Sequence, residues 1–119
     1  MNLEEFQNVI FIILSIMGVG FLAVGIFLMK FPPKRINGLY GYRTSRSMQN
    51  HEAWNYSQRY SAKIMMVLGI VYSILSIVSL FTPKIDDMYS AIISIAIVLT
   101  GVFIMFYKTE KKLAKKFDF

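Results

Sequence analysis

The chain has 119 residues, of which 55% are hydrophobic and only 17% are charged, and its mean hydropathy is +0.51. Soluble domains of this size usually carry about 25% charged residues, so the composition nearly excludes a soluble globular protein and leaves too little polar chain for a separate catalytic domain. A net charge of +6 would favour nucleic acid as a partner of a soluble protein, but here the basic residues flank apolar segments, and we expect no nucleic-acid binding.

Half of the sequence lies in three mostly apolar blocks without Asp, Glu, Lys, Arg or His, at residues 9–29, 64–82 and 88–107. The blocks have 21, 19 and 20 residues, and a helix rises about 1.5 Å per residue, so each block can cross a hydrocarbon layer of about 30 Å. Two glutamates and no basic residue precede the first block, so we interpret it as a permanent helix and not as a signal peptide. The sequence predicts an all-α integral membrane protein, with one domain over 1–119 and three transmembrane helices.

The basic residues are distributed unevenly around these blocks. The loop 30–63 holds seven Lys and Arg and the tail 108–119 holds five, whereas the turn 83–87 holds only Lys84. Three spans require the loop and the tail to share one side, and cytoplasmic connections carry the excess of Lys and Arg. We therefore predict an inner-membrane protein with its N-terminus outside and its loop and C-terminus in the cytoplasm, where anionic lipid headgroups are expected partners of the basic residues.

Small and hydroxyl-bearing residues recur along one face of each predicted span: Ser15, Gly18 and Gly25; Gly69, Ser73 and Ser76; Ser90, Ser94 and Gly101. Lipid provides no hydrophobic drive for helix association, so such stripes favour close backbone approach. The stripes could meet within one chain or in a homo-oligomer. The short connection 82–87 predicts an antiparallel hairpin of the second and third spans, with Asp86 or Asp87 capping the third. We expect the Tyr72 hydroxyl to bond a neighbouring helix.

The loop 30–63 contains turn signals followed by a polar helix. Asn37 and Gly38 form a typical turn dipeptide, and Gly38 and Gly41 give the backbone freedom to fold tightly near the membrane. A short polar helix is predicted to begin around residues 47–50, with Asn50 as its N-cap, and to run unbroken into the second span.

Three side chains of this loop have predicted roles. Trp54 is expected to pack under the helix bundle. Arg43 lies inside the turn motif, where it could fold back against the bundle or a carboxylate. Glu52 is the only acidic residue of the loop and is the predicted internal partner of Arg43 or Arg59.

The stretch 36–48, followed by Glu52-Ala53-Trp54 and the second span, resembles the SdpI family. That family is characterised by a Gly-x-Arg-Thr turn, a few polar residues and a Trp on a helix that enters the membrane. Gly41, Arg43, Thr44 and Trp54 match this pattern in type and order, and Asn37 and Asn55 fall where the family places polar residues. The resemblance covers roughly residues 20–107. The binding or structural motif is predicted to comprise Asn37, Gly38, Gly41, Arg43, Thr44, Glu52, Trp54, Asn55 and Arg59.

The resemblance implies a bacterial membrane protein of immunity or signalling. The family is named for the immunity protein against the sporulation-delaying toxin, and that member also sequesters a transcriptional repressor at the membrane. Longer members carry an additional N-terminal membrane half, so we expect this chain to be a short form. Its function would be to bind a peptide, a lipid or a partner protein, such as a peptide toxin or a cytoplasmic regulator, rather than to catalyse a reaction.

Two other functions stay open at the sequence level. An oligomeric permeation or transport subunit is possible, although the spans contain no ionisable residue of the kind that ion-coupled transporters use. An enzyme acting on lipid headgroups would use Arg43 and Glu52. The chain has no cysteine and one histidine, so we expect no metal site and no cofactor.

Overall fold

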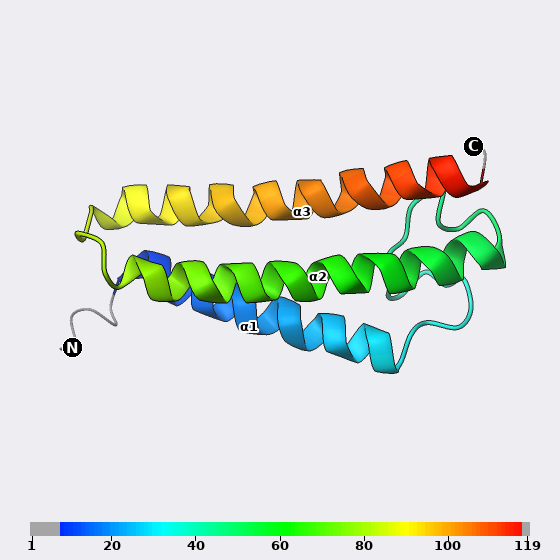
Figure 1. Cartoon of the computed structure of the whole chain (residues 1–119), viewed down its shortest axis with the longest axis horizontal. Coiled ribbons are helices and arrows are strands. Elements are labelled where there is room, and N and C mark those ends of the chain that lie inside the picture. Colours follow the sequence, from blue (N-terminus) through cyan, green and yellow to red (C-terminus); the bar gives the residue numbers. More distant parts are fainter. Residues whose placement is uncertain (1–7, 118–119) are drawn as a thin grey trace.

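The computed structural model describes residues 8–117, and within them the chain forms three α-helices and no strand. These are α1 (Val9–Lys30), α2 (His51–Ser79) and α3 (Asp87–Phe117), and they run up and down an elongated bundle that measures 52 × 25 × 20 Å (Figure 1). All three are long and apolar enough to cross a membrane, which confirms the predicted fold class. Glu4 and Glu5, which precede the first apolar block, lie outside the described residues, and so does the N-terminus that is predicted to face outward.

Two of the helices are longer than a membrane is thick. With 29 and 31 residues, α2 and α3 are about 44 and 46 Å long, against about 30 Å for the hydrocarbon layer. The predicted polar helix is the first part of α2, and the Asn50 side chain caps it by accepting the Ala53 N–H at 2.8 Å. At the other end of the chain, α3 continues through the lysine-rich tail.

The turn between α2 and α3 begins earlier than predicted. The second apolar block reaches residue 82, but α2 ends at Ser79, because the backbone N–H groups of 80–82 bond three residues back in tight turns before Pro83. Asp86 caps α3, accepting the Met88 N–H at 3.2 Å. The predicted antiparallel hairpin is confirmed.

The predicted stripes of small residues meet within one chain. A Cβ added at Gly69 would lie 2.5 Å from the Leu22 nitrogen and 2.7 Å from the Gly18 oxygen, so the backbones of α1 and α2 touch there. One added at Gly18 would overlap the Ser73 hydroxyl. As expected for serines in apolar helices, Ser73 donates its hydroxyl to a carbonyl one turn earlier, that of Gly69, at 2.8 Å.

The third helix presents a seam of buried residues to the other two, at spacings of three and four: Ser90, Ser94, Val98, Gly101, Met105, Thr109 and Leu113. Tyr72 from α2 reaches this seam and donates its hydroxyl to the Val98 carbonyl at 2.9 Å, as predicted. Tyr72, Val98 and Leu14 of α1 form the apolar core at the middle of the bundle. This hydrogen bond thus ties α3 to α2 at the depth where lipid offers no alternative partner.

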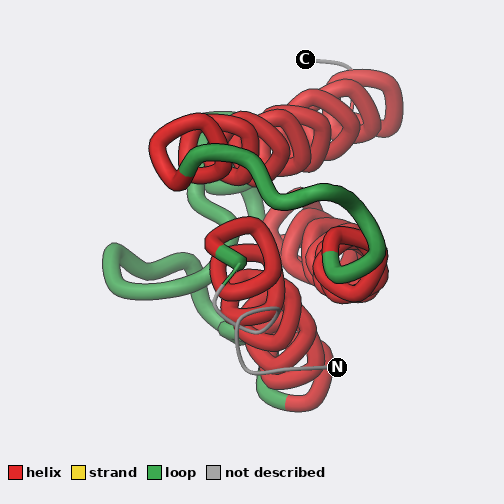
Figure 2. Tube along the Cα trace, turned by 90° about the vertical axis from the view of Figure 1, so that its left-hand side faces the viewer, coloured by secondary structure: helices red, strands yellow, loops and turns green. Residues whose placement is uncertain are grey.

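The outward faces of the helices are strongly apolar. Seen along its axis, the bundle places the three helices at the corners of a triangle, with the connecting loop projecting to one side (Figure 2). Large apolar side chains on each helix are more than half exposed, among them Ile16, Val19, Ile74, Ile92, Leu99 and Phe103. Soluble proteins rarely expose apolar area on this scale, so these faces are suited to lipid contact.

Candidate binding site at the loop end of the bundle

The connecting loop 31–50 folds back onto α2, and Gln58 holds it there. The Gln58 side chain is 1% exposed. Its Oε1 accepts the Tyr42 N–H at 2.7 Å, and its Nε2 donates to the Tyr42 carbonyl, also at 2.7 Å. One amide side chain therefore satisfies both backbone groups of a buried loop residue, in the way that a neighbouring strand would.

A single helical turn follows Tyr42 and completes this anchor. The Thr44 N–H donates to the Ser47 hydroxyl at 2.8 Å, and the Ser47 N–H donates to the Thr44 hydroxyl at 3.2 Å. Ser47 is fully buried, and its hydroxyl lies 3.1 Å from the Tyr42 carbonyl, to which it can donate. The predicted site residue Thr44 thus acts as a turn cap and helps to fix the backbone conformation of the loop.

The ring of Tyr42 ties the loop to α3. Its hydroxyl donates to Glu110 at 2.8 Å, and Arg46 lies 3.2 Å from the other carboxylate oxygen. Burial raises the pKa of Glu110, but the hydroxyl groups of Thr44 and Tyr42 and the nearby guanidinium outweigh it, so the pKa lies below its ordinary value. The pKa of Tyr42 is raised, mainly by burial and to a smaller extent by the neighbouring carboxylate of Glu110. Glu110 lies beyond the apolar block 88–107, at the loop end.

Acid should weaken this connection between loop and tail. A lowered pKa means that Glu110 contributes stability above its unfolded pKa of about 4.3, and that this contribution is lost as the pH falls through the folded pKa. We expect the wild type to melt at a higher temperature than Glu110→Gln at neutral pH, and this difference to shrink as the pH falls below about 4.3. Thermal unfolding in detergent measures this. Glu52→Gln makes the same charge change at an exposed position, and a similar pH-dependent difference there would contradict the assignment.

Trp54 of α2 is packed at the loop end of the helix bundle, as predicted. It is fully buried, and its indole N–H donates to the Pro33 carbonyl at 2.6 Å. Gly41 lies next to this contact with a φ of +105°, where a Cβ would come within 2.6 Å of the Gln58 side chain. This position therefore requires glycine for both conformation and space.

The start of the loop is organised by Asn37. Its side chain accepts the N–H groups of Leu39 and Tyr40 at 2.8 and 2.9 Å, which confirms a turn here. Arg43 is exposed, and its guanidinium donates to the Gly38 carbonyl at 2.8 Å. The expected carboxylate partner of Arg43 is wrong for the described residues, because the backbone turn offers a nearer acceptor, but Arg43 does lie beside residues of the helix bundle.

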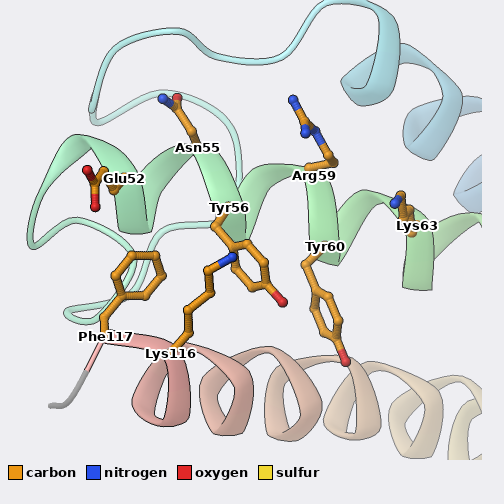
Figure 3. Close-up of a pocket in the computed structure, with 8 residues that line it drawn as sticks. All are labelled: Glu52, Asn55, Tyr56, Arg59, Tyr60, Lys63, Lys116 and Phe117. Atoms are coloured by element: carbon orange, nitrogen blue, oxygen red, sulfur yellow. The ribbon is translucent and has the colours of Figure 1, made fainter.

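The predicted pairing of Glu52 is also wrong. In the described residues, 8–117, the one ion pair joins Arg46 to Glu110, a carboxylate of the tail that lies 64 residues away in sequence. Glu52 lies in the first turn of α2 and lines a groove together with Asn55 and Arg59, whose side chains extend from the side of α2 that is turned away from α3 (Figure 3). The nine predicted motif residues thus divide into a loop group, a buried Trp54 and an exposed face of α2.

Several grooves adjoin the loop end, and two of them are large enough and suitably lined to bind a ligand. The first, here called the apolar groove, has a volume of about 480 Å³ and lies where all three helices meet the loop. Its lining residues are Val24, Phe27, Leu28, Tyr40, Gly41, Tyr42, Arg43, Ser61, Met65, Met105 and Phe106. The second, here called the basic groove, has a volume of about 630 Å³ and lies between α2 and the end of α3 (Figure 3). It is lined by Glu52, Asn55, Tyr56, Arg59, Tyr60, Lys63, Lys116 and Phe117.

The described residues contain no group of three or more His, Cys, Asp or Glu side chains that could hold a metal ion. The residues that organise the site most directly, Tyr42, Gln58 and Glu110, were not among the predicted site residues. The position of Gln58 could have been predicted, because it shares a helix face with Trp54. The role of Glu110 could not, because nothing in the sequence places the tail beside the loop.

Three apolar helices with a structured loop at one end define a multi-pass membrane protein. Residues 34–108 match the model of the SdpI/YfhL protein family, and the chain belongs to that family. The chain is 35% identical over 103 residues to the Bacillus subtilis (strain 168) protein YfhL, which is described as uncharacterized, and the match covers 83% of this chain and 84% of that protein. No solved structure matches. The predicted resemblance is therefore confirmed, and the family is not a known enzyme family.

Proposed function

We propose that this protein is a non-catalytic binding protein of the inner membrane, which protects the cell against a membrane-active peptide or signals its presence. In this proposal the loop and the C-terminus face the cytoplasm. The distribution of Lys and Arg supports this orientation, since only Lys84 lies on the other side. Membership of the SdpI/YfhL family supports the immunity role.

The apolar groove is the observation on which the proposal rests. Its helix walls are apolar except for Ser61, and its loop wall includes Gly41 and Arg43 of the family motif. An apolar peptide segment in the membrane would bury its side chains against Phe27 and Phe106, while an anionic group at its end would pair with Arg43. The combination of an apolar recess and one exposed guanidinium suits an amphipathic peptide better than a small polar substrate.

The position of the loop also suits signalling. Residues 40–43 line the groove on one side and form part of the loop surface on the other, because Tyr40 and Arg43 are exposed. A peptide in the groove would contact the loop directly and alter the surface offered to a cytoplasmic regulator. Immunity and signalling would therefore depend on the same side chains.

A protection assay tests the proposal. Expressed in cells sensitive to the sporulation-delaying toxin, the wild-type chain should raise survival. Arg43→Ala should lower the highest toxin concentration that the cells survive by about tenfold, because one charge-assisted contact is worth ~1.5 kcal/mol or more. Arg35→Ala removes the same charge from the same loop but not from the groove, and should protect like wild type. Equal killing with and without the wild-type protein would rule out immunity to this toxin.

A further inference from the structure

The basic groove has an aromatic wall between two helices. Tyr56 and Tyr60 extend from α2 toward α3, with their rings stacked at a centroid distance of 5.8 Å (Figure 3). Lys116 reaches back from α3, and its Nζ lies 4.2 Å from the centroid of the Tyr56 ring. This cation–π contact holds an ammonium group inside the groove rather than in free solvent.

The groove carries excess positive charge. Arg59, Lys63 and Lys116 line it, against the single carboxylate of Glu52. Within residues 8–117 none of these four side chains takes part in an ion pair. Glu52 lies at the end of the groove near Phe117, away from Lys63 at the other end (Figure 3). The end of the groove nearer the membrane is therefore basic, and no carboxylate lines it among the residues that the structure describes.

The depth of the groove matches the headgroup layer. On α2, Lys63 directly precedes the apolar block 64–82. On α3 the apolar block ends at Tyr107, which lines a recess with Tyr60 and the first tail lysines. Tyrosine rings prefer the boundary between hydrocarbon and water. A lipid in the adjoining leaflet would thus bring its phosphate to the level of Lys63 without leaving the membrane.

We propose that the basic groove binds the phosphate group of an anionic phospholipid. Lys63 and the Tyr60 hydroxyl lie at the level expected for the phosphate, and Lys116 and Tyr56, which meet about 10 Å further along α2, face the outer part of the headgroup and add to the positive field of the groove. This differs from the diffuse attraction that every basic residue near an anionic leaflet experiences. It is independent of the peptide-binding function proposed above, because the two grooves share no lining residue.

The test compares lipid retention by native mass spectrometry on the full-length chain. After exchange into a mixture of phosphatidylglycerol and phosphatidylcholine, wild type should retain one phosphatidylglycerol per chain in preference to phosphatidylcholine. The double variant Lys63→Gln/Lys116→Gln should retain about tenfold less. Lys30→Gln/Arg35→Gln makes the same charge change outside the groove and should behave like wild type. Lys63→Arg/Lys116→Arg keeps the charge and should retain the lipid even if the glutamine variant fails to fold.

Three results would overturn the proposal. If the control variant loses as much lipid as the groove variant, the attraction is diffuse. If phosphatidylcholine is retained equally well, the charge of the headgroup is not recognised. If inorganic phosphate alone binds the delipidated chain and displaces phosphatidylglycerol at similar concentrations, the groove is a site for free phosphate and not for a lipid.

Discussion

Replacing Gly69 with alanine is expected to destabilise the helix bundle by about 3 kcal/mol or to prevent its folding. The new methyl group would lie 2.5 Å from the Leu22 nitrogen and 2.9 Å from its Cα. These are backbone atoms of α1, so no side chain can turn aside, and the two helices would have to separate. Because lipid adds no hydrophobic drive, lost packing at this crossing is not compensated elsewhere.

Gly20→Ala is the matched control, since a Cβ at that position of α1 has no atom within 4 Å. It should be neutral or raise stability by up to about 1 kcal/mol through its better helix propensity. Unfolding in mixed micelles of increasing SDS content, followed by circular dichroism, gives both values. Equal stabilities for the two variants would show that α1 and α2 do not cross at Gly69.

Gln58→Ala is expected to release the loop and to cost about 1–3 kcal/mol, because it removes the acceptor of the buried Tyr42 N–H and one of the two donors to the Tyr42 carbonyl. The hydrogen bond from Ser47 can still satisfy the carbonyl, but the N–H of Tyr42 loses its acceptor. Amide hydrogen exchange at Tyr42 should therefore become much faster, while the amides of the apolar core around Tyr72 stay protected.

Gln49→Ala provides the comparison for this loop. Gln49 is exposed and precedes α2, so its truncation should leave both stability and the exchange of the Tyr42 amide unchanged. If the Tyr42 amide exchanges as slowly in Gln58→Ala as in the wild type, the role given to Gln58 is contradicted.

The membrane helices and much of the loop end follow from the sequence. Uncharged blocks of about 20 residues permit few structures other than spanning helices. Asn50 identified the start of α2 because an amide oxygen can accept free N–H groups there. The buried face of α2 could be predicted from Trp54, and the polar contact to α3 from Tyr72. Both are large side chains with one polar atom, which need burial and also a hydrogen-bond partner.

The pairing of charges could not be predicted in the same way. Glu52 is near Arg43 in sequence, but the helical turn of α2 directs it to the opposite groove. Arg46 instead meets Glu110, and this depends on how far α3 extends beyond the membrane and on its rotation about its axis. Both are consequences of packing along the whole seam of α3, which no local pattern specifies.

Membrane sidedness is the most direct test of the account, because the proposed peptide and lipid sites depend on which leaflet the loop faces. The chain has no cysteine, so single cysteines can be introduced in place of the exposed residues Ser45, in the loop, and Lys84, in the opposite turn. With a membrane-impermeant thiol reagent on intact cells, the account predicts labelling at position 84 and labelling at position 45 only after permeabilisation. Labelling at position 45 in intact cells, with none at position 84, would contradict it.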